Sequence, residues 1–145
     1  QVAYLTICLR GFGDQRCELT KSKHAMGSLA HCQHLDLGSN NISDPGLASL
    51  SYACANGALA NLTYLNLRSN QIGDPGMSAL AGAIASGSMA KLQILHLQVN
   101  AIGDAGMTAL ADALDGRALH ALNQLWIDSP PAKLRAACIP VSLMT

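Results

Sequence analysis

The sequence of 145 residues is poor in charge and in aromatic side chains. Charged residues make up 12% of the chain and aromatic residues 3%, and nine Lys and Arg balance nine Asp and Glu. Without a basic surplus, the chain lacks the positive potential that drives binding to a phosphate backbone, so a nucleic-acid partner is disfavoured. A run of about 18 apolar residues, long enough to span a bilayer, is also missing. We therefore expect no membrane partner.

The cysteines are odd in number and carry no paired motif. Five are present and no two form a CxxC pair, so neither a complete disulfide framework nor a zinc knuckle fits. Reduced thiols are the simplest interpretation, and together with the lack of a signal-peptide layout they favour a cytoplasmic protein, with a secreted protein as the alternative. Because the sequence opens at Gln1 rather than at a methionine, we expect a fragment of a longer protein. The phosphate-binding patterns GxGxxG and GxxxxGKS/T do not occur, and we expect no cofactor.

Leucine, by contrast, is abundant and recurs at a fixed interval of 30 residues. Columns in this phase include Leu35, Leu65, Leu95 and Leu125; Asn40, Asn70 and Asn100; and Asp44, Asp74 and Asp104. Repeats of this period are typical of solenoids. We expect units to begin near residues 2, 32, 62, 92 and 122, the first degenerate and the last truncated. Residues 1–145 then form a single repeat domain.

Each unit changes its hydrophobic period partway along. Residues 64–68 alternate in polarity, which predicts a short strand with its two leucines on one side. After Asp74 the apolar residues recur at three- and four-residue spacing, which predicts a helix. Asp74 is expected to be the N-cap and Pro75 the first helical residue, and the Ser-Gly-Ser run at 86–88 is expected to end the helix.

The units must stack, because one strand and one helix cannot bury their leucines alone. Neighbouring strands approach to about 4.8 Å, whereas helices with their side chains are about 10 to 12 Å wide. The stack is therefore expected to bend into part of a horseshoe. Parallel strands would line its concave face and helices its convex face, which is an α/β solenoid.

The repeated pattern resembles a known family. LxxLxLxxNxIxDxGxxxL is present at Leu92, Leu95, Leu97, Asn100, Ile102, Asp104, Gly106 and Leu110, and it resembles the leucine-rich repeat. The long unit is similar to the ribonuclease-inhibitor-like subclass, whose relatives include NOD-like receptor sensor regions and Ran GTPase-activating proteins. The resemblance implies that Asn40, Asn70 and Asn100 form a structural ladder of buried loop asparagines.

Two features depart from that subclass. Its units usually run about 28 or 29 residues, while this array keeps to 30. Residues 129–145 leave the pattern and are expected to be an irregular tail or a cap. A short helix from Pro131 through Lys133 to Cys138 would make a poor cap, and unrelated sequence is the alternative.

Specific binding must come from residues that the repeat leaves variable. The outward strand positions on the concave face are Tyr4, Thr6, His34, Asp36, Tyr64, Asn66, Arg68, Ile94, His96, Gln98, Gln124, Trp126 and Asp128. Three of the five aromatic residues fall among these positions, and Tyr, Trp and Arg dominate interface energetics. Tyr64, Arg68 and Trp126 are the foremost candidates. The alternative is that aromatic residues simply suit strands.

Catalysis and metal binding are disfavoured. His34 and Asp36 are about 7 Å apart along one strand, and His96 lies about 10 Å away, two strands on, too far for shared ligation or direct proton transfer. The grouping of His24, His31, Cys32 and His34 resembles a metal site, but by phase Cys32 points inward while His34 points to the concave face.

We therefore expect a non-enzymatic module that recognises another protein through its concave face. The alternatives are a GTPase-activating or other enzyme-regulator protein, and a sensor-region fragment of a NOD-like receptor. Because both ends of the array lack polar caps, self-association through the uncapped repeat ends is a further expectation.

Overall fold

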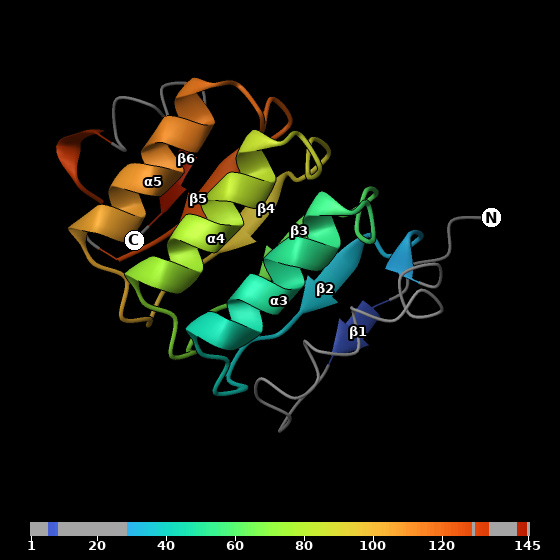
Figure 1. The fold of residues 1–145 in the computed structure, drawn as a ribbon, viewed down its shortest axis with the longest axis horizontal. Coiled ribbons are helices and arrows are strands. Elements are labelled where there is room, and N and C mark those ends of the chain that lie inside the picture. The colour runs from blue at the N-terminus through green and yellow to red at the C-terminus, as the bar shows by residue number, and fades with distance from the viewer. Residues whose placement is uncertain (1–5, 9–28, 129, 134–141, 145) are drawn as a thin grey trace.

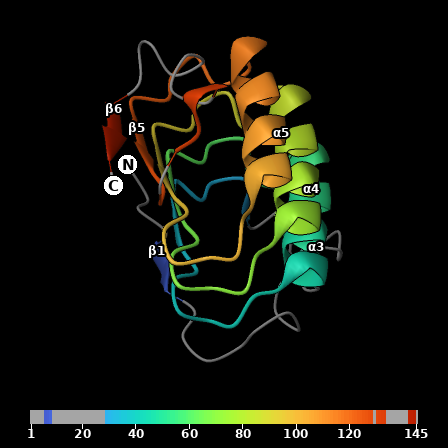
Figure 2. The ribbon, with the colours of Figure 1, turned by 90° about the vertical axis from the view of Figure 1, so that its left-hand side faces the viewer.

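Strands and helices alternate along the chain in two layers. The structure is a computed structural model that describes residues 6–8, 29–128, 130–133 and 142–144. Its elements are β1 (Thr6–Cys8), β2 (His34–Asp36), α3 (Asp44–Ala55), β3 (Tyr64–Asn66), α4 (Asp74–Ala85), β4 (Ile94–His96), α5 (Asp104–Asp115), β5 (Gln124–Trp126) and β6 (Ser142–Met144). The three helices lie side by side over one side of the sheet (Figure 1, Figure 2). None of the helices in these ranges is long and apolar enough to cross a membrane.

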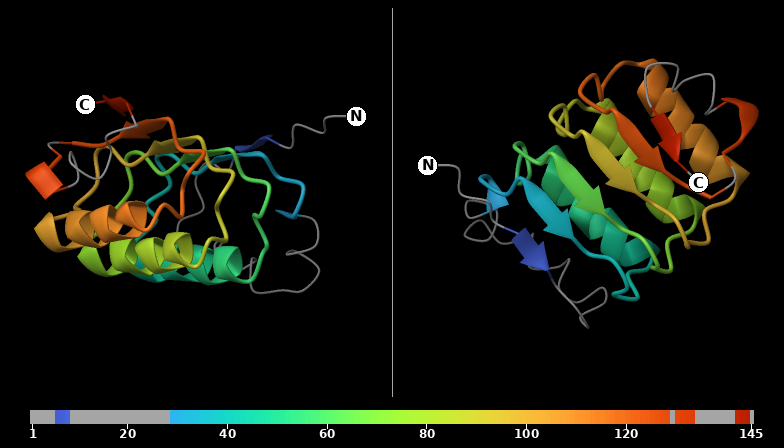
Figure 3. Two further views of the ribbon diagram at one scale, coloured as in Figure 1. Left: turned by 90° about the horizontal axis from the view of Figure 1, so that it is seen from above. Right: turned by 180° about the vertical axis from the view of Figure 1, so that it is seen from behind.

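The strands form one open parallel sheet in chain order from β1 to β6, which the right-hand view of Figure 3 shows from the strand side. From β2 to β5 the pairing keeps the interval of 30, with Leu35 opposite Leu65, Leu65 opposite Leu95, and Leu95 opposite Leu125. β2, β3 and β4 are each followed by a helix. This arrangement confirms the expected α/β solenoid of stacked strand and helix units.

The first pairing departs from the expected interval. Thr6 in β1 pairs with His34 in β2, so the interval is 28 residues (34 minus 6) rather than 30. Successive side chains of a strand alternate between its two faces, so a shift by two residues keeps the same set on each face. The interval from the first strand to the second is therefore two residues shorter than the interval between the later strands.

The core lies between the sheet and the helices. The central leucine of each strand from β2 to β5 is at most 4% exposed, and the helix leucines Leu50, Leu80 and Leu110 are buried in the same cluster. Cys32 and Cys54 are also fully buried there. Burying one leucine side chain contributes about 1.5 to 3 kcal/mol, so the repeated columns dominate the stability of the array.

The sequence predicts Asp74 as the N-cap of its own helix, and this prediction is wrong. α4 begins at Asp74 itself, and the N-cap position is held by Gly73, which has no side chain to accept a hydrogen bond. The aspartate of the preceding unit takes this role. Asp44 Oδ1 accepts hydrogen bonds from the backbone N–H groups of Gly73 (2.7 Å) and Gly76 (3.0 Å). One unit therefore caps the helix of the next.

The glycine column follows from this contact. Asp74 Oδ1 repeats it one unit later, accepting from Gly103 (2.7 Å) and Gly106 (2.8 Å). A Cβ atom at Gly76 would lie 2.5 Å from Asp44 Oδ1, and one at Gly106 would lie 2.7 Å from Asp74 Oδ1. Real Cβ atoms do not approach so closely. Glycine is needed there because a carboxylate occupies the space of a side chain.

The loop asparagines join neighbouring units through hydrogen bonds. Asn70 Oδ1 accepts from the N–H groups of Asn40 (3.1 Å) and Ile42 (2.9 Å), while its Nδ2 donates to backbone carbonyls of both units. Asn100 repeats the pattern, with Oδ1 accepting from the N–H of Ile72 at 3.2 Å. Buried backbone groups must be paired, so these amides hold the strand-to-helix loops in register.

The C-terminal segment adds a strand where the sequence predicts an irregular tail or a cap. β6 pairs in parallel with β5, with Leu143 opposite Leu125, and extends the sheet by one strand. Residues 132–133 are helical, and the remainder of the expected helix through Cys138 lies outside the described residues. A three-residue strand outside the repeat has no periodicity of its own, so its pairing with β5 is decided by tertiary contact.

Leu95→Ala is expected to lower the free energy of unfolding by about 2 to 5 kcal/mol, because it leaves a cavity at a fully buried site. Tyr52→Ala is the control, since this side chain is 61% exposed on α3 and its removal should cost at most about 0.5 kcal/mol. Urea unfolding monitored by circular dichroism measures both. Equal losses would mean that the strand phase is wrong.

Asp74→Ala is expected to cost about 1 to 2 kcal/mol more than Asp104→Ala. Both aspartates begin a helix, so the lost interaction with the helix dipole is common to the two variants. Asp74 also accepts two backbone hydrogen bonds from the start of α5, while Asp104 is exposed. Thermal unfolding of the two variants side by side tests this; identical melting temperatures would contradict capping across the repeat boundary.

Candidate functional site

The candidate site is the side of the sheet opposite the helices, here called the open strand face. Side chains that alternate with the buried leucines form three rows across β2 to β5 and the residues that follow them. The rows are His34, Tyr64, Ile94 and Gln124; Asp36, Asn66, His96 and Trp126; and Gly38, Arg68, Gln98 and Asp128. The first two rows are half-buried, while Arg68 and Asp128 are exposed.

Four rings on this face contact one another in succession and form a ring ladder. His34 stacks on Tyr64 with 3.9 Å between ring centroids and 10° between planes. Tyr64 meets His96 at 5.3 Å and 49°, and His96 stacks on Trp126 at 5.3 Å and 23°. Such ring pairs contribute about 0.5 to 1.5 kcal/mol each beyond their burial. The ladder is therefore an ordered surface that crosses four neighbouring strands.

The register of the sheet explains the course of the ring ladder. Tyr64 lies directly opposite His34, and Trp126 lies directly opposite His96, because both pairs are in register across parallel strands. Between β3 and β4 the ladder steps from the first row to the second. Diagonal neighbours on a sheet face are about 7 to 8 Å apart at their backbones, a distance that aromatic side chains bridge.

Polar side chains beside the ring ladder are held by local hydrogen bonds. Asp36 Oδ1 accepts from the backbone N–H of Gly38 (3.0 Å) and from Asn66 Nδ2 (2.8 Å). Asn66 Oδ1 in turn accepts from the backbone N–H of Arg68 at 2.9 Å. A Cβ atom at Gly38 would lie 3.0 Å from Asn66 Nδ2, so glycine leaves room for this network. The backbone of Arg68 is thereby tied to Asn66, while its side chain is exposed.

The part of the face around β4 and β5 departs from the regular pattern. Within the described residues, Gln98 Oε1 and Trp126 Nε1 are buried side-chain atoms without a hydrogen-bond partner. Val99 follows Gln98 with a positive φ of 57°, the conformation that Ser39 and Ser69 have at the same position of their units, but a β-branched residue is unusual there. Its side chain is 55% exposed. Its backbone N–H donates to Asp128 Oδ2. At the same position of the two preceding units, the N–H groups of Ser39 and Ser69 donate to backbone carbonyls, so this part of the face uses a side-chain carboxylate in place of a backbone acceptor.

Two groups on the face have shifted pKa values. The pKa of His96 is lowered, first because burial disfavours the charged imidazolium and second because Arg68 repels it, while Asp36 acts in the opposite direction. The pKa of Tyr64 is raised by burial and by the negative charge of Asp36. Both shifts favour neutral rings at His96 and Tyr64 at neutral pH.

Several expected site residues do not join this arrangement. Tyr4 and His24 lie outside the described residues, and Thr6 is placed only by its backbone pairing with His34. Ile94 and Gln124 lie in the first row but outside the ring ladder. The sequence places the four ladder rings on one face but does not predict that they stack. The 30-residue spacing of His34 from Tyr64, and of His96 from Trp126, is the signal that would have found two of the contacts.

The histidines and cysteine near the start of the second unit do not converge. Cys32 is fully buried, and its Sγ donates to the backbone carbonyl of His34 at 3.4 Å, while His31 is exposed. Burial raises the pKa of the Cys32 thiol above its usual value, despite that hydrogen bond. Across the described part of the chain, no group of three or more His, Cys, Asp or Glu side chains is placed to hold a metal ion.

The repeated units match a known protein family. The family model described as Leucine Rich repeat matches residues 29–51, 58–81 and 88–111. These units are leucine-rich repeats. Each match covers a strand, the asparagine loop and the first two turns of the following helix, and leucine-rich repeats are commonly protein-interaction modules. No curated protein is similar enough in sequence to match the chain.

His96 is expected to make the stability of the repeats pH-dependent. Folding lowers the pKa of His96. Once the pH falls below about 6.5, its imidazole is therefore protonated more readily in the unfolded chain than in the folded protein. The contribution of neutral His96 is thus present at neutral pH and is lost as the pH falls through the folded pKa. Between about pH 7.5 and about pH 5, the free energy of unfolding should therefore fall less in the His96→Gln variant than in the wild type. Urea unfolding at both pH values tests this, and equal losses in the two proteins would contradict it.

Proposed function

We propose that this leucine-rich repeat protein is a non-enzymatic recognition module that binds another protein through its open strand face. The ring ladder is the observation that carries the proposal. It places four half-buried rings across four strands, next to the exposed guanidinium of Arg68. Tyr, Trp and Arg are the residue types that most often dominate protein interfaces.

The order of the ring ladder favours binding. Each ring is already fixed by its neighbours and by a rigid sheet, so little side-chain freedom remains to be lost when a partner covers it. The stacked rings also cover one another's faces, so their edges and polar tips are what a partner meets. This arrangement suits a protein surface with carbonyl and aliphatic groups better than a flat ligand that needs an open ring face.

The unpaired atoms near β5 support the same surface. Gln98 carries an acceptor and Trp126 a donor at this end of the face, and within the described residues neither Gln98 Oε1 nor Trp126 Nε1 has a hydrogen-bond partner. We therefore infer that binding energy is concentrated at Tyr64, Arg68 and Trp126, with Asp36, Asn66, Gln98 and Asp128 setting specificity.

The proposal extends to the repeat subclass, the cellular compartment and the assembly of the protein. Helices of twelve residues in each unit support the ribonuclease-inhibitor-like subclass. Cys32 and Cys54, buried in the core, support a cytoplasmic protein. The open parallel sheet supports a chain that belongs to a longer array or associates with itself through its ends. Regulation of a GTPase is the alternative function, and no described residue favours it.

The test combines three substitutions on the open strand face: Tyr64→Ala, Arg68→Ala and Trp126→Ala. Partners are captured from the source lysate with the wild-type chain, identified, purified and titrated by calorimetry. The triple variant is expected to bind at least about tenfold more weakly, a change of about 1.4 kcal/mol. It should also melt at a lower temperature, because the ring ladder is lost, so the titration is done well below that melting point.

The matched control lies on the helix side. Tyr52→Ala, Ser78→Ala and Gly82→Ala change three exposed positions on α3 and α4, including an exposed tyrosine. This variant should bind like the wild type. Unchanged binding by the strand-face variant, or an equal loss in the control, would move the interaction site elsewhere.

A further inference from the structure

Two opposite charges lie on the open strand face, one strand to either side of β4. Arg68 follows β3 and Asp128 follows β5, and both side chains are exposed. Because they are two strands apart, their backbones are separated by about 10 Å. Among the described residues, the ion pair is that of Lys133 with Asp112, and neither Arg68 nor Asp128 takes part in one. Both charges are therefore available to a group outside the molecule.

The middle strand of this part of the face is uncharged. Ile94, His96 and Gln98 are the residues of β4 and its extension in the three rows, and Val99 follows with 55% of its side chain exposed. The pKa of His96 is lowered, chiefly by burial, so its ring is neutral at neutral pH. A neutral strand is thus flanked by one positive and one negative side chain.

A two-fold axis along β4 makes this face complementary to itself. When two copies meet face to face about that axis, each row is kept and each strand lies opposite the strand on the other side of β4. Arg68 of one copy then faces Asp128 of the other, and the same contact forms twice. An axis along β3 would instead bring two copies of Arg68 together, and an axis along β5 would bring two copies of Asp128 together. Of β3, β4 and β5, only β4 pairs opposite charges.

The remaining contacts about this axis are also compatible. Tyr64 of one copy faces Gln124 of the other, since both lie in the first row, and Asn66 faces Trp126 in the second row. An amide meets an aromatic ring in each of these pairs, and an amide carries both a donor and an acceptor. The residues of β4 face their own copies and are uncharged. No like charges therefore meet across β3, β4 and β5.

We propose that a second copy of this chain occupies the open strand face, in a symmetric dimer whose two-fold axis runs along β4. The inference rests on the proposed function, because it names one occupant of the surface described there. Two ion pairs between Arg68 and Asp128, one on each side of the axis, set the register of the two copies. Asp128 Oδ2 already accepts from the N–H of Val99, so Oδ1 is the oxygen that receives the guanidinium.

The size of this interface predicts a weak dimer. β3, β4 and β5 lie about 4.8 Å apart, so three strands cover much less than the roughly 800 Å² per partner that a stable complex buries. We expect a dissociation constant on the order of 100 μM. A protein that binds the face more tightly would displace the second copy.

Sedimentation equilibrium of the full chain tests the dimer at low ionic strength, from about 10 μM to about 1 mM, where the wild type should pass from monomer to dimer. Arg68→Asp leaves two carboxylates on the face, and Asp128→Arg leaves two cations. Each variant alone should dimerise at least about tenfold more weakly, because like charges meet. An equimolar mixture of the two variants should form a heterodimer, since every carboxylate then faces a cation. The double variant should dimerise like the wild type.

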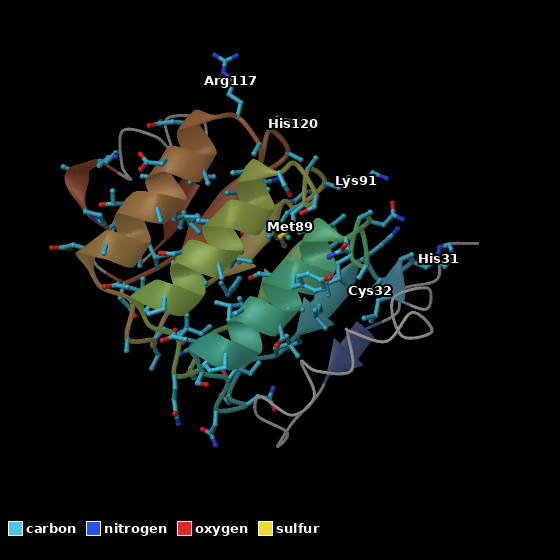
Figure 4. The ribbon with its side chains drawn as sticks, in the orientation of Figure 1. His31, Cys32, Met89, Lys91, Arg117 and His120 are labelled. Carbon is cyan, nitrogen blue, oxygen red and sulfur yellow. The ribbon has the colours of Figure 1, made fainter. Side chains whose placement is uncertain are left out.

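Matched controls make the same charge changes away from the face. Arg117 lies in the turn after α5 and points away from the molecule (Figure 4), and Asp115 is exposed at the end of α5. Arg117→Asp and Asp115→Arg should dimerise like the wild type. Asp128→Asn guards against a disturbed fold in Asp128→Arg, because it keeps an oxygen for the N–H of Val99. It should also weaken the dimer, since it removes the charge.

Three results would overturn the proposal. The first is a wild type that stays monomeric up to about 1 mM. The second is a mixture of Arg68→Asp and Asp128→Arg that forms no heterodimer. The third is dimerisation that none of these changes affects, which would assign self-association to the ends of the array. Any of these leaves the proposed function standing if the strand-face triple variant still loses its captured partner, so the two failures are distinct.

Discussion

Pairing the buried backbone groups of the strand-to-helix loops is the constraint on which the rest of the structure depends. Stacked units cover these loops, so their N–H and C=O groups need partners inside the protein. Asn70 and Asn100 supply them across unit boundaries, and Asp44 and Asp74 do the same for the helix starts. Each repeat therefore completes the hydrogen bonding of its neighbour, and the array is stable only as an array.

The same contacts fix what the open strand face presents. Because the asparagine and aspartate bonds keep the units of β2, β3 and β4 in register, Tyr64 falls beside His34. The parallel pairing of β4 with β5 places Trp126 beside His96. The rings then stack without needing a partner to order them. The scaffold residues repeat and the face residues vary, so one rigid architecture carries a surface of individual chemistry.

Much of this could be predicted from the sequence, because periodicity along a chain maps directly onto stacked units. The leucine columns, the strand and helix order and the side of the sheet that carries Tyr64 all follow from it. The role of Asp74 does not, because its position in the repeat shows where a helix starts but not which helix its carboxylate reaches. The step of the ring ladder from Tyr64 to His96 depends on side-chain rotamers, which periodicity does not determine. β6 lies outside the repeat, so periodicity does not predict it.

Native-state hydrogen exchange in an Asn70→Ala variant tests most directly whether neighbouring repeats hold one another. In the wild type, Asn70 Oδ1 accepts from the amides of Asn40 and Ile42, while the amide of Ile72 is bonded to Asn100. We expect the Asn40 and Ile42 amides, in the preceding repeat, to exchange much faster in the variant, while the Ile72 amide changes less. Unchanged exchange at Asn40 and Ile42, or the same acceleration at all three amides, would contradict mutual support between repeats.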